Sequence, residues 1–244
     1  MIDHYSIAIV KNIYKRPKAM SEVTSQLIYG EKFNIIKKSK NWLKIKTSYD
    51  KYSGYIKNNK FTQKLRPTYK THKLKTKIFY KKKNKKEFLP FNSRLELINK
   101  KGKYFEFEKN KWVKFSAVKK IEFKEKNYTK ILKYFKGCKY LWGGKTFKGI
   151  DCSALIQIYY HFNNKFFHRD TKDQIKKVKK LKNFSNFERG NIIYWKGHVA
   201  VCIDKKRLIH AYGPKKKVLI MNIKDTIKKI SETAQLEVIK ISKI

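Results

Sequence analysis

Cys152 stands at the predicted start of a helix, where a cysteine can serve as a nucleophile. The segment Asp151–Phe162 is typical of a helix, with Asp151 at its N-cap, and it follows a glycine-punctuated loop. A cysteine in the first turn lies near the positive end of the helix dipole, which favours the thiolate and can bring its pKa below about 7.5. The backbone N–H of Cys152 can also hold a developing oxyanion. The position therefore predicts nucleophilic chemistry.

His198 and His210 supply the base that such a nucleophile needs. They lie in two adjacent predicted strands, His198–Asp204 and Arg207–Ala211. Pairing of these strands can bring His210 beside His198, where it can orient the imidazole and fix its tautomer. The set predicts acyl transfer through a Cys–His–His site. The remaining histidines have no such setting and are expected to be structural or exposed: His4, His72, His161 and His168.

The second half of the chain must position these three residues. A short helix is expected at Tyr128–Phe135, and Gly137–Gly149 reads as a loop before the cysteine helix. Strands are then expected at Gly190–Trp195, at the two histidine segments and at Val218–Asn222. A helix followed by an antiparallel sheet predicts an α+β domain over residues 122–244.

The first half contains a weak internal repeat. Segments 32–45 and 94–107 share the same spacing and alternate apolar with polar residues, which is the period of a half-buried strand. An aromatic–aliphatic pair follows each segment, Tyr55-Ile56 in the first and Trp112-Val113 in the second. We therefore expect two small β modules, at residues 1–62 and 63–121, with Lys81–Lys86 as a solvated loop in the second.

The charge is strongly positive, with 62 Lys and Arg against 18 Asp and Glu and a formal net charge of +44. Phosphate binding needs cations gathered on one face, and base readout favours arginine. Here the basic residues are nearly all lysines spread evenly from Lys11 to Lys243. The spread favours a compositional lysine bias, so no specific nucleic-acid partner is expected.

The three cysteines are an odd number without paired spacing, which predicts a reducing compartment and structural roles for Cys138 and Cys202. Asp3 and His4 precede the first apolar patch where a leader peptide would carry basic residues. No apolar run is long enough to span a membrane. A cytoplasmic protein is expected, with a monomer as the default.

Five motifs between Tyr140 and Ala211 resemble the NlpC/P60 cysteine peptidases. They are Tyr140-Leu-Trp-Gly-Gly144, Gly149-Ile-Asp-Cys-Ser153, Arg169-Asp-Thr-x-x-Gln174, Gly190-x-Ile-Ile-x-Trp195 followed by His198, and Ile209-His-Ala211. The resemblance implies a papain-like α+β domain with Cys152, His198 and His210 as the catalytic residues. It implies no metal and no cofactor.

The two β modules resemble bacterial SH3-like β barrels. Together with the catalytic motifs, they make the chain similar to the SH3-containing γ-D-glutamyl-L-diamino acid endopeptidases, of the dipeptidyl-peptidase VI type. That resemblance implies hydrolysis, through a thioester, of the bond between D-Glu and the diamino acid in peptidoglycan-derived peptides. The substrate would carry a free N-terminal L-Ala.

The same resemblance implies a set of substrate-binding residues. Ser153 and Asp170 match positions that hold the free α-amine of the L-Ala, and Tyr140 matches a tyrosine beside the nucleophile. In the subgroup that this chain resembles, an acidic residue and a tyrosine of the first module close one end of the substrate cleft. Glu22 and Tyr52 are the candidates for these two residues. Asp151 and Trp142, from the same motifs, are grouped with the substrate-binding residues. Two positions depart from the family: Ala154 replaces the usual Gly, and Asn191 replaces the usual Asp.

Two other classes are compatible with these residues. One Cys and two His can hold zinc with an open position, which would make the protein a metalloenzyme. Alternatively, the chain could be a binding protein whose SH3-like modules bind cell wall or nucleic acid, with a hydrolase domain of weak or different amidase activity. The helix-start cysteine and the presence of every catalytic position favour the peptidase.

Overall fold

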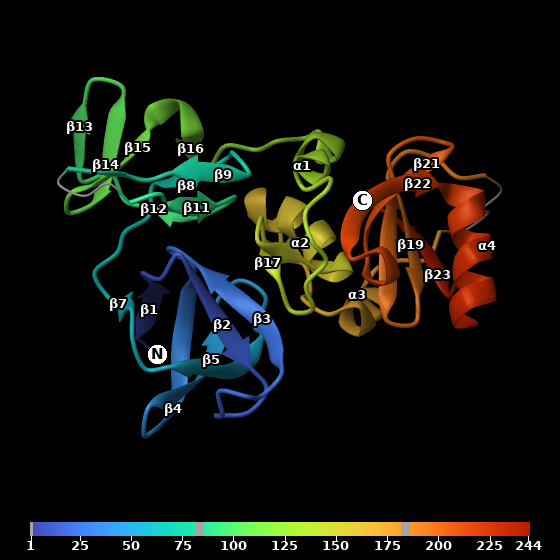
Figure 1. The fold of residues 1–244 in the computed structure, drawn as a ribbon, viewed down its shortest axis with the longest axis horizontal. Coiled ribbons are helices and arrows are strands. Elements are labelled where there is room, and N and C mark those ends of the chain that lie inside the picture. Colours follow the sequence, from blue (N-terminus) through green and yellow to red (C-terminus); the bar gives the residue numbers. More distant parts are fainter. Residues whose placement is uncertain (1, 82–84, 182–185) are drawn as a thin grey trace. The chain divides into compact units, whose positions relative to one another are not determined.

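The structure is a computed structural model of the 244-residue chain, and it describes residues 2–81, 85–181 and 186–244. It divides into two compact units (Figure 1). Unit 1 comprises Met1–Lys124 with His161–Asn164, and unit 2 comprises Glu125–Tyr160 with Lys165–Ile244. Both predicted β modules lie in unit 1. Within the expected loop Lys81–Lys86, residues 82–84 lie outside the described residues.

The first module is a seven-stranded antiparallel sheet in the order β3-β2-β6-β5-β4-β1-β7. Alternation builds it: in β5, Leu43 and Ile45 are buried while Lys44 and Lys46 are exposed. Its core includes Ile13, Leu27, Phe33 and Ile56. The strands are β1 (Asp3–Ser6), β2 (Val10–Tyr14), β3 (Val23–Ile28), β4 (Lys32–Ser39), β5 (Trp42–Thr47), β6 (Ser53–Lys57) and β7 (Phe61–Thr62).

The second module consists of three small sheets, in the orders β10-β15-β14-β13, β11-β9 and β12-β8-β16. Its strands are β8 (Tyr69–Thr71), β9 (Lys75–Lys77), β10 (Phe79–Tyr80), β11 (Phe88–Pro90), β12 (Arg94–Leu95), β13 (Asn99–Lys101), β14 (Tyr104–Glu108), β15 (Lys111–Lys114) and β16 (Val118–Lys120), with a 3-10 turn, Phe115–Ala117, before the last. The closed barrels implied by the resemblance are not found in the described part of the chain.

The internal repeat has a counterpart in strand pairing. Leu43 in β5 pairs with Ile56 in β6, and Phe105 in β14 pairs with Val113 in β15. All four are fully buried. The two modules nevertheless share a core, because Tyr29 of the first module belongs to the hydrophobic cluster of the second.

Unit 2 has the predicted order of helices followed by an antiparallel sheet. The sheet order is β22-β21-β20-β19-β23, with α4 along one side of it and α1 and α2 on the other (Figure 1). Its elements are α1 (Tyr128–Tyr134), β17 (Lys145–Thr146), β18 (Gly149–Ile150), α2 (Cys152–Phe162), α3 (Thr171–Lys177), β19 (Asn191–Trp195), β20 (His198–Cys202), β21 (Arg207–Tyr212), the 3-10 turn Gly213–Lys215, β22 (Lys217–Asn222), α4 (Ile223–Ala234) and β23 (Lys240–Lys243).

Six of these elements were not predicted from the sequence: the short strands β17 and β18, which lie where a loop was expected, the 3-10 turn, α3, α4 and β23. Helix α4 begins after Asn222, whose side chain accepts a hydrogen bond from the N–H of Asp225 (3.3 Å). Its apolar residues Ile223 and Ile230 pack on Ala200, Cys202 and other residues of the sheet. Helix α4 therefore covers the sheet that carries both histidines.

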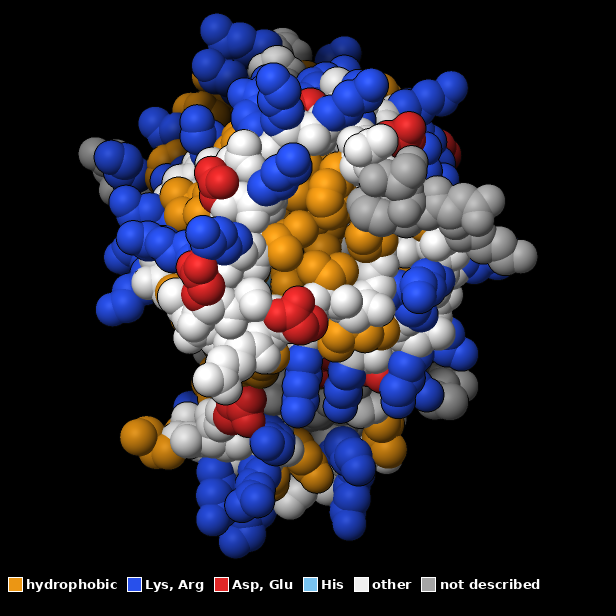
Figure 2. All heavy atoms as spheres, turned by 90° about the vertical axis from the view of Figure 1, so that its right-hand side faces the viewer, with side chains coloured by type: hydrophobic (Ala, Val, Ile, Leu, Met, Phe, Trp, Pro, Cys, Tyr) orange, Lys and Arg blue, Asp and Glu red, His pale blue; other side chains and the backbone are white. Residues whose placement is uncertain are grey.

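The positive charge has no single location on the face drawn in Figure 2. Lysine and arginine side chains are scattered around that face and do not gather along one groove. Among the helices of the described residues, none is long and apolar enough to cross a membrane.

Candidate active site

Asp151 fixes the start of α2 and the loop before it. One carboxylate oxygen accepts a hydrogen bond from the N–H of Ala154 (2.8 Å), which caps the helix as predicted, and the other accepts from the N–H of Gly143 (3.0 Å). Asp151 is buried, with 5% of its surface exposed. The carboxylate therefore anchors the turn from which Cys152 projects.

Arg169 neutralises this buried carboxylate. Its two terminal nitrogens donate to the two oxygens of Asp151, at 2.9 and 2.6 Å, which is the bidentate geometry that suits a guanidinium. Arg169 also donates to the hydroxyl of Ser153 (3.0 Å), and that hydroxyl donates to Asp151 (3.1 Å). The three side chains form a closed, buried network around the first turn of α2.

Two glycines let the loop fold tightly against this turn. A Cβ added to Gly144 would lie 2.5 Å from the carbonyl oxygen of Gly149, and one added to Gly149 would lie 2.4 Å from the Cβ of Leu141. Neither contact is sterically possible, so both positions require glycine. Close approach thus explains Gly144 and Gly149, and the positive φ of 72° explains Gly143 in the Gly-Gly motif.

The Cys152 thiol faces the start of β20. Its sulfur lies 3.9 Å from the carbonyl oxygen of Gly197, and the N–H of Val199 hydrogen-bonds to it. The hydroxyl of Thr171 also hydrogen-bonds to this sulfur. Since Gly197 and Val199 flank His198, the helix start brings the nucleophile to the histidine strand.

The pKa of Cys152 is raised overall, contrary to the expectation of a lowered value, because burial outweighs the effect of the helix start. Burial raises this pKa to about 12, and the negative charge of Asp151 adds to the rise. The hydrogen bonds from Val199, Thr171 and the backbone of Ser153 act in the opposite direction. They do not replace the hydration that a thiolate loses in a fully buried position. The resting thiol is neutral.

His198 and His210 contact each other as the strand pairing predicted. The Nε2 of His198 lies 3.0 Å from the Nδ1 of His210. Strand β20 pairs with β21 through Val201–Ile209 and Cys202–Leu208, and the same register makes the two histidines diagonal neighbours. His198 uses Nε2 for this contact, so its Nδ1 is the nitrogen available to a nucleophile.

Both imidazoles are neutral at physiological pH. Burial lowers the pKa of His198 to about 4. Burial, followed by the charge of His198, lowers the pKa of His210 to about 3. Each ring therefore carries a single N–H, and the pair can take up a proton only when a neighbouring group supplies one.

Two known protein families match parts of the chain. Residues 137–235 match the NlpC/P60 family, and residues 13–61 match the bacterial dipeptidyl-peptidase SH3 domain. The chain carries an NlpC/P60 domain behind an SH3 domain. The predicted family and enzyme class, a cysteine peptidase, are thereby confirmed, as are the α+β fold class and the SH3-like module.

Two curated relatives cover most of the chain. Dipeptidyl-peptidase 6 of Lysinibacillus sphaericus is 24% identical over 237 residues, covering 84% of this chain and 86% of that protein. Gamma-D-glutamyl-L-lysine dipeptidyl-peptidase of Bacillus subtilis (strain 168) is 23% identical over 231 residues, covering 84% and 77%. A solved NlpC/P60 family protein from Bacillus cereus ATCC 10987 shares the fold, with a TM-score of 0.78, 15% identity and coverage of 91% of this chain and 94% of that one.

Two aromatic residues of the Tyr140 motif lie at the NlpC/P60 site in different ways. Tyr140 is half-buried, and burial, followed by its electrostatic interaction with the Cys152 sulfur, raises its pKa. Its phenol therefore lies near the nucleophile and keeps its proton. Trp142 is 58% exposed. Tyr140 is therefore close to the reacting sulfur, whereas Trp142 presents an open aromatic surface.

The predicted binding residues differ in whether they are available to a ligand. Asp151 and Ser153 are buried and use their polar atoms within the Arg169 network. Asp170 is different: it occupies the N-cap position of α3 but its side chain does not cap the helix. Burial raises its pKa, with Arg169 next to it opposing the rise. Asp170 is thus a half-buried carboxylate without a capping role.

Glu22 and Tyr52 belong to unit 1. Glu22 is exposed and its carboxylate lies 3.1 Å from the Nζ of Lys15. Tyr52 is half-buried, packs against the core of the first module and donates its N–H to the Thr47 hydroxyl (2.8 Å). Their part in substrate binding remains a prediction.

Four residues of the NlpC/P60 site were not assigned roles from the sequence: Arg169, Thr171, Gln174 and Met221. Gln174 donates to the carbonyl oxygens of Ser153 (3.2 Å) and His168 (2.9 Å), which ties α3 to α2. The motif Arg169-Asp-Thr-x-x-Gln174 was the available signal for three of them. Met221 had none, because it ends a run of four apolar residues in β22 in which nothing distinguishes it. Within the described residues, no group of three His, Cys, Asp or Glu side chains is placed to hold a metal ion.

Lowering the pH from about 7.5 to about 4.5 is expected to reduce the free energy of unfolding. His198 and His210 bind protons near pH 6.5 when unfolded but only near 4 and 3 when folded. The unfolded chain therefore binds more protons across this window, and stability is lost as the pH falls through it. Urea unfolding of wild type and His210→Gln measures the effect. Between pH 7.5 and 4.5, the free energy of unfolding should fall by roughly 1–3 kcal/mol less in the variant than in wild type. Identical pH dependence in both proteins would contradict the assignment.

Proposed function

We propose that this chain hydrolyses the γ-D-Glu–diamino acid bond of peptidoglycan-derived peptides that carry a free N-terminal L-Ala. The observation that carries the proposal is that His198, which contacts His210, directly follows Gly197, whose carbonyl oxygen lies 3.9 Å from the Cys152 sulfur. The names of the two curated relatives, which match 84% of this chain and 86% and 77% of their own lengths, support the substrate class.

In the proposed reaction, the Nδ1 of His198 takes the Cys152 proton as sulfur attacks the γ-carbonyl carbon. His210 holds the ring of His198 and stabilises the imidazolium that forms. Because Cys152 and His198 are both neutral at rest, proton transfer accompanies the attack and does not precede it. The backbone N–H of Cys152 at the start of α2 is the proposed oxyanion donor.

Breakdown of the tetrahedral intermediate then releases the diamino acid. The C–N bond breaks as His198 gives its proton to the leaving amine, which leaves a thioester on Cys152. A water molecule, deprotonated by His198, attacks the thioester and releases L-Ala-D-Glu. The thiol is thereby restored, and no oxidant, reductant or metal enters the balance.

Asp170 is the proposed partner of the substrate's α-ammonium group. It is a half-buried carboxylate that does not cap α3. A charge-assisted bond from an ammonium group would compensate its desolvation. Ser153, whose hydroxyl is used by Asp151 and Arg169, is proposed to support this position through that network. Glu22 and Tyr52 are proposed to complete the end of the cleft, with Tyr140 and Trp142 contacting the peptide near the scissile bond.

Asp170→Asn is expected to lower kcat/KM for L-Ala-γ-D-Glu-L-Lys by roughly 10- to 100-fold, because the charge-assisted bond between the half-buried carboxylate and the substrate's ammonium group is lost. The same change should have little effect on hydrolysis of the N-acetylated peptide, which has no ammonium group. Kinetics with both peptides, and mass spectrometry of the products, measure this. Asp173→Asn, in the first turn of the same helix, is the matched control and should behave as wild type. Equal loss on both peptides would contradict the ammonium role.

A further inference from the structure

Met221 lies behind the histidine pair. Its Sδ is 3.3 Å from the Nε2 of His210, and the Nδ1 of His210 is 3.0 Å from the Nε2 of His198. The arrangement is a chain of contacts from a thioether through two imidazoles. Strand β22 supplies it by register: Leu208 pairs with Met221 and His210 pairs with Leu219, so Met221 is a diagonal neighbour of His210.

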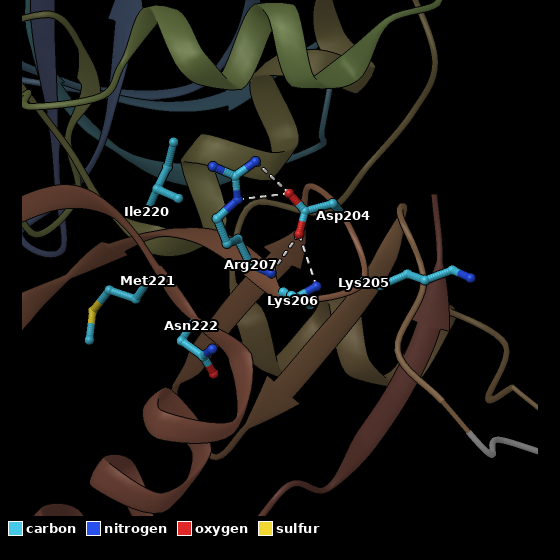
Figure 3. Close-up of a pocket in the computed structure, with 7 residues that line it drawn as sticks. All are labelled: Asp204, Lys205, Lys206, Arg207, Ile220, Met221 and Asn222. Carbon is cyan, nitrogen blue, oxygen red and sulfur yellow. Dashed lines mark hydrogen bonds and ion pairs between the residues drawn. The ribbon is translucent and has the colours of Figure 1, made fainter.

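The thioether also borders an open pocket of about 700 Å³. Asp204, Arg207 and Asn222 are among the other residues that line it, and Figure 3 shows Ile220 and Met221 pointing in opposite directions from β22. On the hairpin side of this pocket, Asp204 accepts a hydrogen bond from the Nε of Arg207 (2.8 Å). Met221 thus has His210 on one side and a solvent-accessible space on the other.

The chemistry of the thioether decides which nitrogen of His210 carries the proton. A thioether has no hydrogen to donate and can only accept. The contact with Met221 is therefore a hydrogen bond only if the Nε2 of His210 carries the N–H. The ring is neutral, so its Nδ1 must then be the acceptor.

The same logic extends to His198. An acceptor at the Nδ1 of His210 requires the N–H of His198 to be on Nε2. The Nδ1 of His198 is then left with a lone pair, which is the state that can take the Cys152 proton. In the opposite tautomer, Nδ1 of His198 would carry a hydrogen and could not act as a base.

We infer that Met221 is a positioning residue that fixes the tautomers of His210 and His198, and thereby keeps His198 in its basic form. The inference rests on the proposed function, because it concerns the base of that reaction. Water in the place of the thioether could donate as well as accept, and so would permit both tautomers. A side chain that only accepts removes that freedom.

The test is nitrogen-15 NMR of the histidine rings in the free enzyme, which reports directly which ring nitrogens are protonated. Wild type should show both His198 and His210 protonated at Nε2. Met221→Leu, which keeps the apolar volume but has no acceptor, should show a mixture of tautomers in both rings. Its kcat should fall about 5-fold, as expected for the loss of one hydrogen bond, with KM unchanged.

Two further variants separate this role from packing. Met221→Glu restores an acceptor through its ionised carboxylate, which has no hydrogen to donate, and should recover the wild-type tautomers in both rings. Ile220→Val is the control, because the side chain of Ile220 points in the opposite direction from that of Met221. This variant should match wild type in both its histidine tautomers and its kcat. An unchanged tautomer in Met221→Leu would overturn the inference. The NMR spectrum is recorded without substrate, so the tautomer assignment does not depend on the peptide that is cleaved. Failure to cleave the proposed peptide would refute the proposed function alone.

Discussion

Replacement of Cys152 by alanine is expected to lower kcat/KM by at least about 10⁴-fold, because the acyl-enzyme can no longer form. The thiol is the group that the start of α2 presents to the strand of His198, between contacts with Gly197 and Val199. Residual turnover would come only from substrate binding and the oxyanion donor. Steady-state kinetics on L-Ala-γ-D-Glu-L-Lys, with product identification by mass spectrometry, measures the loss.

The matched control for this experiment is Cys202→Ala. Cys202 is also fully buried and packs in the core beneath α4, so both variants remove one buried sulfur. Cys202→Ala should retain turnover within about 3-fold while losing about 1 kcal/mol of stability. If Cys152→Ala kept more than about a tenth of wild-type turnover, the nucleophile would have to be another group.

Replacement of Arg169 by methionine is expected to cost about 3–5 kcal/mol in the free energy of unfolding. The side chains of Arg169 and Asp151 are 1% and 7% exposed, so the variant leaves an unpaired buried carboxylate that water cannot reach. That carboxylate also caps α2 and holds Gly143. The loss should therefore reach the active site, and kcat should fall together with stability. Urea unfolding followed by far-UV circular dichroism measures the first effect.

Arg207→Met is the comparison for this ion pair. Arg207 and Asp204 also form an ion pair, with an N–O distance of 2.7 Å, but their side chains are 59% and 37% exposed. Water screens such a pair, so the expected cost is below about 1 kcal/mol. Comparable losses of unfolding free energy in Arg169→Met and Arg207→Met would show that burial does not determine how much the Arg169–Asp151 pair contributes to stability.

A second substitution, Asp151→Asn, should restore part of the stability lost in Arg169→Met, since it removes the uncompensated charge.

The sequence located the local elements of the site well. The predicted helix 151–162 corresponds to α2 (Cys152–Phe162), and the four predicted strands correspond to β19–β22 within one or two residues. These segments are long enough, and regular enough in their apolar pattern, for local signals to fix them. Helix α3 and strand β23 are short and rich in lysine, and their positions depend on packing against distant segments. Such elements leave a weak local signal.

Composition could not identify which charged residues are buried. Among 62 basic residues, Lys70 is fully buried, and its Nζ donates to the carbonyl oxygens of Ile121 (2.8 Å) and Phe123 (2.7 Å). Nothing in the surrounding sequence distinguishes it from the exposed lysines. Burial is a property of the packed chain, because it depends on which segments meet around a side chain.

By itself, the sequence determined the nucleophile's place at a helix start, the two histidine strands and the motifs of the family. These features depend on residues that are close together in the sequence, so local patterns are enough to predict them. Only the tertiary structure decided the protonation of the site. Burial turns Cys152 into a neutral thiol and both histidines into neutral imidazoles, against the expectation from the helix dipole. It also brings Met221 to His210, a contact between strands that no spacing along the chain could reveal.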